Sequence, residues 1–290
     1  MKRDLHEENR RSWNSATEAH NSHKGDQAKF LREGGSTLFP EEIALLGDLR
    51  GCALVHLQCN SGQDTLSLAR LGATVTGVDI SDTAIEFARR LSAESGIPAT
   101  FERSDVYDWL AATAAGAERF DVAFASYGAL CWLSDLRAWA RGIAAILKPS
   151  GRLVVMEFHP MAMIFEWDWR LAHPYFGEGR PLTWDEGIGD YVAMSGSGLV
   201  PWGYVEGVAD FKNPHRVHEF QWPISEVVTA VLDAGLTLTA LREYPYSNGA
   251  KQFDGMRETE GRRMIPPESV PNLPLMYGLA ATLGPPHPSA

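Results

Sequence analysis

The chain has 290 residues, and its 26 lysine and arginine residues against 37 aspartate and glutamate residues give a formal net charge of −11. Its length allows one large domain or two small ones, and a hydrophobic content of 44% is typical of a globular protein, which disfavours disorder or a fibre. Phosphate contacts supply most of the affinity of proteins that modify nucleic acids. An acidic chain whose basic residues occur only in short pairs is therefore not expected to act on DNA or RNA.

The N-terminus and the cysteines predict a cytoplasmic protein. The first residues are charged and lack the apolar stretch of a secretory signal. The longest nearly apolar run, 122–133, has 12 residues, fewer than the ~20 that a membrane span needs. Three cysteines without CxxC spacing predict free thiols in a reducing compartment.

Residues 1–50 are expected to be helical. The first 35 residues are mostly polar, include Trp13 as a large apolar residue, and end at the helix-breaking pair Gly34-Gly35. Pro40 is expected to open a further helix, because proline suits the first helical position.

Strands and helices alternate from residue 53 onward. Short apolar or β-branched runs predict strands, and the amphipathic runs between them predict helices. The expected strands are 53–57, 74–78, 99–103, 120–124, 152–157, 236–243 and 273–283, and the expected helices are 63–71, 81–96, 134–148 and 224–234, with Ser81 and Ser134 as caps. This alternation predicts an α/β fold with a parallel sheet and right-handed crossovers. Residues 284–290 are expected to form a loose tail.

The segment 158–222 is unusually aromatic. It holds 13 of the chain's 29 Phe, Trp and Tyr residues, about twice the density of the whole chain, and shows no clear helical period. Such side chains can wall an apolar pocket, and the alternative is that they fill the core of a cap. The candidates are Trp167, Trp169, Tyr175, Phe176, Trp184, Tyr191, Trp202 and Tyr204.

The residues that follow each expected strand suit a nucleoside. Ligands of open parallel sheets bind beyond the carboxyl ends of the strands. Asp79 ends the second strand, where a carboxylate can accept bonds from two ribose hydroxyls, and the apolar Ile80 can pack on a base. Asp105 follows the third strand and suits an adenine amino group. Neither GxGxxG nor GxxxxGK[ST] occurs, which argues against dinucleotides and nucleoside triphosphates.

Five motifs in this order resemble class I S-adenosylmethionine-dependent methyltransferases. They are HLQCNSG at 56–62 followed by QDTLSLA, then GVDIS at 77–81, DV at 105–106, FDV at 120–122 and LKPSGRL at 147–153. The family's first loop usually reads D/E-x-G-x-G-x-G. Here His56 replaces the acid, Gln58 and Asn60 replace two glycines, and only Gly62 remains. This variant loop looks like that of a subgroup of small-molecule methyltransferases.

The resemblance implies an architecture and a cofactor. It predicts a Rossmann-like α/β fold with a seven-stranded sheet of order 3-2-1-4-5-7-6. Residues 1–50 would form a helical lid, 51–158 the cofactor-binding half, 159–222 a substrate cap, and 223–284 the helix and strands that complete the sheet. The cofactor would be S-adenosylmethionine, with S-adenosylhomocysteine as product.

The resemblance also assigns roles to single residues. Asp79 would bind the ribose diol, Ile80 would pack on adenine, and Asp105 would meet the adenine amine. The methionine side and the sulfonium would be lined by Leu57, Gln58, Cys59, Asn60, Gly62, Ser126 and Tyr127, and Trp13, Ser104 and Val106 complete the expected cofactor site. The alternatives are that Asp79 is only a turn acid, that Asp105 and Ser104 cap a helix, and that Gln58 and Asn60 are turn residues without ligand contact.

The acceptor is expected to be a small metabolite. The N-P-P-[YF] signature of enzymes that methylate amines in macromolecules is absent, and with the aromatic segment this favours an aromatic or heteroaromatic, indole-like acceptor in natural-product biosynthesis. The candidate general bases are His20, His23, Glu157, His159, His173 and Tyr175, and of these His159, His20 and Tyr175 are preferred. His159 is alternatively a turn residue before Pro160, and Glu157 is alternatively the group that holds a loop. No metal site is expected, because the pairs His20/His23 and His215/His218 lack a third ligand at suitable spacing.

Other functions remain open at this stage. The protein could use the cofactor only as a ligand, in a regulatory module, or it could be an enzyme of the same fold that does not transfer the methyl group. Methylation of a macromolecule is a weaker alternative. The expected partners are a small-molecule acceptor and, as a homodimer, a second copy of the chain, although a monomer is equally compatible; no nucleic-acid or membrane partner is expected.

Overall fold

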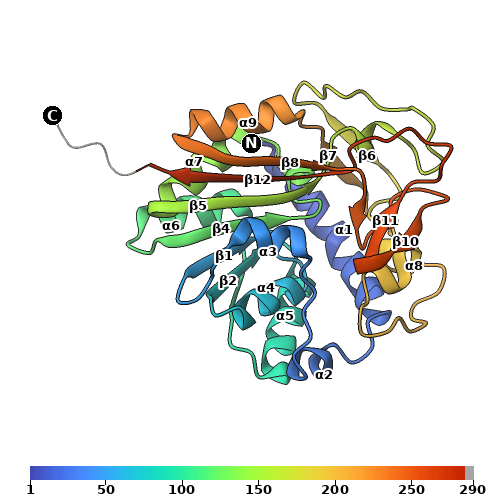
Figure 1. Cartoon of the computed structure of the whole chain (residues 1–290), viewed down its shortest axis with the longest axis horizontal. Coiled ribbons are helices and arrows are strands. Elements are labelled where there is room, and N and C mark those ends of the chain that lie inside the picture. Colours follow the sequence, from blue (N-terminus) through green and yellow to red (C-terminus); the bar gives the residue numbers. More distant parts are fainter. Residues whose placement is uncertain (285–290) are drawn as a thin grey trace.

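The computed structural model describes residues 1–284, so the expected tail at 285–290 lies outside the described residues. Its centre is a seven-stranded sheet with the order β3-β2-β1-β4-β5-β12-β8 (Figure 1). The strands are β1 (Ala53–Leu57), β2 (Thr74–Asp79), β3 (Thr100–Arg103), β4 (Phe120–Ser126), β5 (Leu147–Phe158), β8 (Leu236–Tyr244) and β12 (Met276–Leu283). The first five are parallel, and β12 runs antiparallel to both of its neighbours. The predicted order 3-2-1-4-5-7-6 is confirmed.

Helices cover both faces of this sheet. One face carries α6 (Val106–Ala115), α7 (Leu136–Ile146) and α9 (Ile224–Asp233), and the other carries α3 (Pro40–Leu46), α4 (Gln63–Arg70) and α5 (Asp82–Ser95). Along β4, Val122 and Phe124 enter one core while Ala123 and Ala125 enter the other. Burial on both faces explains why the central strands read as apolar runs.

The helix caps are in part as predicted. Ser81 accepts a hydrogen bond from the backbone of Ala84 at 3.1 Å, and α5 ends at Gly96 in a left-handed conformation. The prediction that Ser134 caps α7 is wrong. Asp135 caps it, because its carboxylate accepts from the Ala138 backbone at 2.9 Å.

Helix α6 was not expected. Asp105 caps it by accepting a hydrogen bond from the Tyr107 backbone at 2.9 Å. Its sequence, VYDWLAATAA, is apolar around most of the helix and lacks a clear polar stripe. The helical period is therefore weak in this segment, although the helix itself packs well.

Most of the remaining elements gather beyond the end of the sheet where the parallel strands finish (Figure 1). They are α1 (Arg3–Ser22), the antiparallel pair β6 (Pro181–Trp184) and β7 (Val217–Phe220), and α8 (Tyr191–Ser195). Helix α2 (Gln27–Arg32) instead packs against α5. A small sheet joins β9 (Ser247–Asn248), β10 (Arg257–Thr259) and β11 (Arg263–Ile265). Short 3₁₀ turns occur at Leu130–Trp132, Ala162–Ile164, Gly196–Gly198 and Glu260–Arg262.

This assembly differs from the expected division of the chain in one respect. The small sheet lies in 223–284, the range expected to do no more than complete the central sheet. Residues 247–265 instead sit at the cap end of the molecule. Within residues 1–284 no helix is both long and apolar enough to cross a membrane.

Candidate active site

A cavity of about 700 Å³ lies where the parallel strands end, bounded by the sheet, α1 and the cap. Eleven of the thirteen expected cofactor residues line it, namely Trp13, Gln58, Cys59, Asn60, Asp79, Ile80, Ser104, Asp105, Val106, Ser126 and Tyr127. Leu57 and Gly62 do not. Leu57 is fully buried in the core below, and Gly62 forms the left-handed turn before α4. The structure thus brings most of the expected residues to one enclosed space.

The first loop keeps its path without the usual glycines. Gln58, Asn60 and Gly62 have φ angles of 56°, 48° and 79°, all in the left-handed region that glycine adopts most readily. The Gln58 side chain donates to the Ala129 carbonyl at 2.6 Å, and the Asn60 side chain accepts from the Ser61 backbone at 2.6 Å. These bonds offset the strain of the two non-glycine residues. The Gln58 Oε1 atom is buried and has no hydrogen-bond partner among residues 1–284.

Asp79 holds the loop and still faces the cavity. One carboxylate oxygen accepts from the backbone of Asn60 and the other from that of Ser81, both at 2.8 Å. Burial raises the pKa of Asp79 to about 6, while these backbone donors oppose the shift. Each oxygen keeps a lone pair for a ligand, and the apolar Ile80 lines the cavity beside it.

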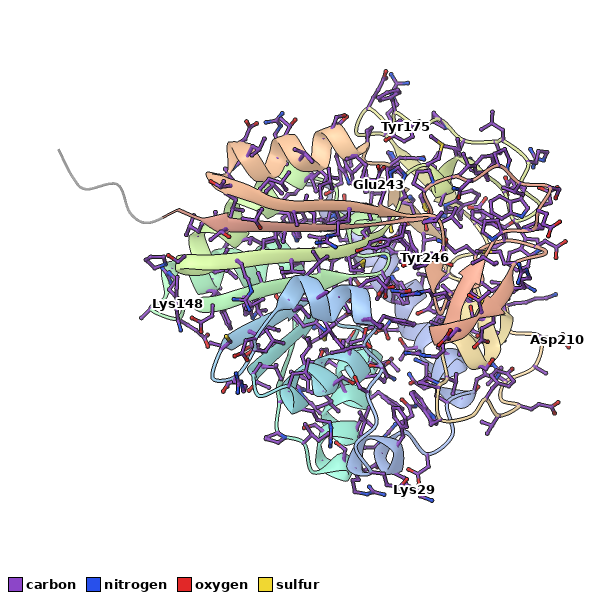
Figure 2. The ribbon with its side chains drawn as sticks, in the orientation of Figure 1. Lys29, Lys148, Tyr175, Asp210, Glu243 and Tyr246 are labelled. Atoms are coloured by element: carbon purple, nitrogen blue, oxygen red, sulfur yellow. The ribbon has the colours of Figure 1, made fainter. Side chains whose placement is uncertain are left out.

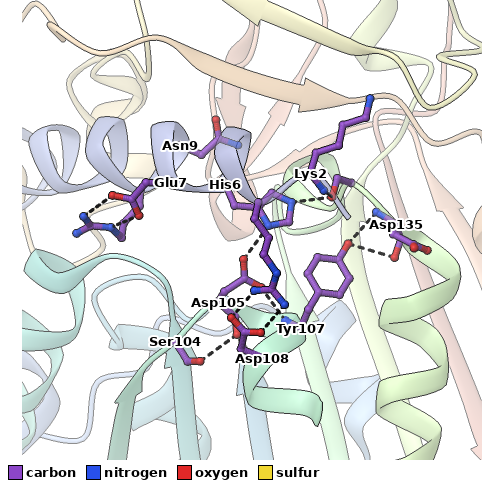
Figure 3. Close-up of polar contacts among 12 residues, drawn as sticks. Lys2, His6, Glu7, Asn9, Ser104, Asp105, Tyr107, Asp108 and Asp135 are labelled. Atoms are coloured by element: carbon purple, nitrogen blue, oxygen red, sulfur yellow. Dashed lines mark hydrogen bonds and ion pairs between the residues drawn. The ribbon is translucent and has the colours of Figure 1, made fainter. Parts of the chain in front are cut away.

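Asp105 has a helix-capping role and a partner on α1. Its Oδ1 atom accepts from the Tyr107 backbone, and its Oδ2 atom lies 2.7 Å from His6 Nδ1 (Figure 3). The other ring nitrogen of His6 lies 2.7 Å from the Ser134 hydroxyl. Burial raises the pKa of Asp105, but the hydrogen bonds from His6 and Tyr107 and the charges of His6 and Arg3 together outweigh it, so the pKa lies below its ordinary value. The helix-cap alternative is therefore present in the structure, and the residue also lines the cavity.

Glu157 organises the loop that follows β4. One of its oxygens accepts from the backbones of Gly128 and Phe158, and the other accepts from Ala129 at 2.7 Å and Leu130 at 2.9 Å. Burial raises the pKa of Glu157, and the four backbone donors oppose that rise. Both carboxylate oxygens of Glu157 thus accept two backbone hydrogen bonds each. This arrangement fits the alternative that Glu157 holds a loop, and not the role of a free base.

His56 is a neutral replacement for the family's usual acid. Its ring nitrogens lie 2.8 Å from the Thr65 hydroxyl and 3.3 Å from the Ser126 hydroxyl. The side chain is buried, and burial lowers its pKa to about 4, so it carries no charge at neutral pH.

A polar end of the cavity was not anticipated. Lys24, from the turn after α1, and Arg262, from the small sheet, both line it together with Thr37 and Asp64. Burial lowers the pKa of Lys24 to about 8 and also lowers that of Arg262. Arg262 donates to the backbone carbonyls of Gly198 and Thr37 at 3.1 and 3.0 Å. Among the described residues, no ion pair joins either cation to a carboxylate.

The other end of the cavity is aromatic. Trp13 meets Trp132 edge to face with ring centroids 5.5 Å apart, and it meets Tyr191 at 6.4 Å. Of the eight cap aromatics singled out from the sequence, Trp184, Tyr191 and Trp202 line this cavity. Trp167 lines a smaller neighbouring cavity, and Trp169 packs on Phe253 at 4.2 Å. Trp132, Phe220 and Trp222 line the cavity as well and were not singled out.

The three predicted bases are absent from the cavity lining. The lining drawn from residues 1–284 includes none of His159, His20 and Tyr175. His159 Nε2 donates to Glu243 on β8 at 2.9 Å while its Nδ1 accepts from the Met161 backbone, so both ring nitrogens are engaged in holding the turn before Pro160.

The other two candidates also lie away from the cavity. His20 Nε2 donates to the Gly189 carbonyl at 2.9 Å, and burial lowers its pKa to about 4. Trp13 and Tyr191 both contact its ring. Tyr175 packs against Phe176 in an outer loop of the cap, near the top edge of the view in Figure 2.

The described residues contain no group of three His, Cys, Asp or Glu side chains that could hold a metal ion. One histidine of each pair considered as a metal ligand contacts a single carboxylate. His23 Nε2 lies 2.8 Å from Asp190, and His218 Nε2 lies 2.9 Å from Glu8.

Comparison with known proteins identifies the central part of the chain. Residues 55–151 match the family model described as a methyltransferase domain. A ubiquinone biosynthesis O-methyltransferase of Methylobacterium nodulans is 35% identical over 103 residues, which are 36% of this chain and 39% of that protein. One of Xanthomonas axonopodis pv. citri is 37% identical over 103 residues, 36% of this chain and 41% of that protein. The chain thus matches about two fifths of these curated relatives.

Solved structures match over a longer range. The CcbJ methyltransferase of Streptomyces caelestis superposes with a TM-score of 0.57 at 14% identity, covering 95% of this chain and 99% of that one. An S-adenosylmethionine-dependent methyltransferase of Mesorhizobium loti gives 0.51 at 19% identity, covering 87% and 99%. Residues 55–151 thus match a methyltransferase domain, and the fold is that of solved S-adenosylmethionine-dependent methyltransferases. The fold predicted from the five motifs is confirmed.

The residues around the cavity fit S-adenosylmethionine. Asp79 offers lone pairs suited to a diol, and Ile80 offers an apolar face for a base. Lys24 and Arg262 suit a carboxylate, because neither has an anionic partner among the described residues. These complementary groups are the features that an amino acid joined to a nucleoside requires.

Proposed function

We propose that the protein transfers a methyl group from S-adenosylmethionine to a small aromatic or heteroaromatic metabolite of the natural-product type. The observation that carries this proposal is the continuity of the cavity, which joins Asp79 and Ile80 at one end to Trp132 and Trp184 at the other. A volume of about 700 Å³ falls in the range of small-molecule sites.

The proposed contacts with the cofactor include those expected from the sequence and add two cations that the structure brings to the cavity. In this proposal Asp79 accepts from both ribose hydroxyls, and Ile80 and Val106 pack against adenine. Asp105 uses its remaining lone pairs for the adenine amine. Lys24 and Arg262 bind the carboxylate of the methionine part, which would supply the anion that both cations lack among the described residues.

The cofactor, when bound, supplies a methyl group on a positively charged sulfur, which is the reactive part of the chemistry. The protein's residues orient the acceptor and exclude water. Trp13 on α1 and Tyr191 on α8 close the cavity above the sheet, and Glu157 fixes the loop beside the aromatic end. This arrangement supports catalysis by proximity and desolvation.

The two curated relatives are named as O-methyltransferases, which supports a hydroxyl group as the methylated atom. The Trp-rich wall suits a flat ring. A phenol-like acceptor and an indole-like acceptor are therefore the first compounds to compare.

Incubation with methyl-labelled S-adenosylmethionine and a panel of phenols, catechols, indoles and amines tests the proposal. We expect label in at least one aromatic product, and we expect Asp79→Ala to lose most of this transfer. Tight cofactor binding without labelled product from any class would instead favour a regulatory module. An altered product that lacks the label would favour an enzyme of the same fold that does not transfer methyl.

A further inference from the structure

One carboxylate in the aromatic end of the cavity has no assigned role. Glu219 lies on β7 and lines the cavity. Its Oε2 atom accepts from Trp184 Nε1 at 3.0 Å, and its Oε1 atom has no hydrogen-bond partner among residues 1–284. Protein atoms surround Glu219 on almost all sides, yet part of its side chain stays accessible. Because Glu219 lines the cavity, we assign this accessible part to the cavity.

The other carboxylates around the cavity are committed elsewhere. Glu157 accepts four backbone hydrogen bonds, Asp79 accepts two, and Asp105 binds His6 and caps a helix. Asp64 accepts from the Thr37 hydroxyl at the polar end. The exception is Glu186, which lines the cavity without a hydrogen-bond partner among the described residues, but its side chain is exposed to solvent. Glu219 is thus the carboxylate that combines a free oxygen with partial burial and an aromatic surrounding.

The position of Glu219 places it beside the loop where transfer is proposed. Strand β7 packs against the turn at Leu130–Trp132, which directly follows the loop that Glu157 holds. Burial raises the pKa of the Cys131 thiol, and the charges of Glu219 and Glu157 raise it further, which places Cys131 near both acids. The aromatic surfaces nearby come from Trp132, Trp184, Phe220 and Trp222.

A carboxylate oxygen in an aromatic surrounding that accepts no hydrogen bond lowers the stability of the protein unless a ligand donates to it. Burial raises the pKa of Glu219, partly opposed by the Trp184 hydrogen bond. A carboxylate with a raised pKa is a stronger base and a stronger hydrogen-bond acceptor, which suits proton removal near neutral pH.

We infer that Glu219 binds and deprotonates the methyl acceptor, and that the acceptor is a flat aromatic ring with a hydroxyl or N–H group at its edge. The inference rests on the proposed function. A lone pair of the acceptor oxygen or nitrogen forms the new bond to the methyl carbon, while the electron pair of the carbon–sulfur bond stays on sulfur, which becomes a neutral thioether. The acceptor's proton moves to Glu219 Oε1, so charge and atoms balance.

Binding of matched ring pairs tests this without any turnover. The protein is saturated with S-adenosylhomocysteine, and the dissociation constants of phenol against anisole and of indole against 1-methylindole are measured by calorimetry. Within each pair a methyl group replaces the donor hydrogen, so the acceptor loses its donor and gains one carbon. We expect wild type to prefer at least one donor ring over its methylated partner by tenfold or more, because a charge-assisted hydrogen bond is strong in this enclosed place.

Two variants at the same position separate charge from shape. Glu219→Gln keeps an oxygen for the Trp184 N–H but has no charge, and Glu219→Leu has no acceptor. We expect the preference to shrink in Glu219→Gln and to fall below twofold in Glu219→Leu, with affinity for the methylated rings and for S-adenosylhomocysteine unchanged within twofold. Glu206→Gln, in an exposed loop of the cap, is the matched control.

The outcomes distinguish this inference from the proposed function. Wild type that binds no donor ring, or binds both members of each pair equally, overturns the role of Glu219. A labelled-methyl assay in which Glu219→Gln keeps full activity also overturns it. A preference that depends on Glu219, in a protein that transfers label to no acceptor, supports the binding role while the proposed function fails.

Discussion

His6 Nδ1 lies 2.7 Å from Asp105 Oδ2, and this contact joins the first turns of α1 to the residue that follows β3 (Figure 3). The same imidazole reaches the Ser134 hydroxyl at 2.7 Å. One residue of the N-terminal helix thereby connects the two loops that flank the expected adenine end of the cavity. This contact gives physical content to the expectation that the N-terminal segment acts as a lid.

His6→Ala is expected to loosen this connection. Removing a hydrogen bond to a partly buried carboxylate costs about 1.5–3 kcal/mol, so we expect S-adenosylhomocysteine to dissociate at least fivefold faster. Stopped-flow displacement measures this rate. Glu18→Ala, an exposed substitution on the same helix, is the control, and an unchanged rate in His6→Ala would show that the contact does not retain the cofactor.

The same pair affects acid stability. His6 contributes to the lowered pKa of Asp105, so the charged carboxylate stabilises the folded protein above the carboxyl's ordinary pKa. That contribution is lost as pH falls through the lowered value. His6→Ala should therefore show a shallower decline of unfolding free energy at acid pH, measured by urea titrations at a series of pH values.

Asp79 should couple pH to cofactor binding with the opposite sign. Its pKa is raised from 3.8 to about 6, chiefly by burial, so the folded protein without ligand is stabilised by protonation. The contribution of Asp79 to stability is greatest below pH 3.8 and is lost as pH rises through about 6. Binding needs the ionised carboxylate, so affinity for S-adenosylhomocysteine should rise across the same window.

Calorimetry between pH 5 and 8 measures this dependence, with those limits set roughly one unit or more from the shifted value. Asp79→Ala should weaken binding at least tenfold and flatten the pH dependence. Asp254→Ala, at an exposed position, is the control. Equal affinity in wild type and Asp79→Ala would remove the ribose assignment.

Glu157 is expected to be a major stabilising residue. In Glu157→Gln the amide nitrogen cannot accept, so two of four backbone N–H groups lose their partner in a buried place. Each unsatisfied donor costs about 1–3 kcal/mol, and we expect a loss of about 2–4 kcal/mol in unfolding free energy. Urea denaturation measures it, and the exposed Glu118→Gln should change it by less than about 0.5 kcal/mol.

Gly62 and Gly96 offer a paired test of the first loop. Both have positive φ angles, 79° and 68°, so alanine is strained at either position. A Cβ at Gly62 would lie 2.8 Å from atoms of Ala88 and Phe101, whereas a Cβ at Gly96 meets nothing within 4 Å. Gly96→Ala should cost about 1 kcal/mol. Gly62→Ala should cost at least about 1 kcal/mol more, from overpacking; equal losses would show that the loop can shift freely.

Most of the central sheet could be predicted from the sequence. Ser81 and Gly96 mark the ends of α5, and alternating runs mark the strands, because capping and side-chain period act between neighbours in the chain. The two positive φ angles of Gln58 and Asn60 also follow from the family pattern, since those positions correspond to glycines. Helix α6 escaped prediction because its residues lack a strong period.

The bases and the polar end could not be predicted in the same way. His159 looked catalytic by its position after β5, yet Glu243, 84 residues later, occupies its ring nitrogen. Lys24 and Arg262 both line the cavity only because a helix and a small sheet fold over the same end of the molecule.

The sequence alone therefore determined the family, the strand order and most residues at the nucleoside end, since these depend on local backbone preference and on motifs at fixed spacing. The tertiary structure decided which acids are free. Glu157 is buried and Glu219 is half-buried, and both lie near the same loop, but four backbone donors satisfy the first, whereas the second has one indole donor. That difference arises because β7 packs against the turn at Leu130–Trp132, which lies far from it in the sequence. No short stretch of the sequence carries information about such a contact.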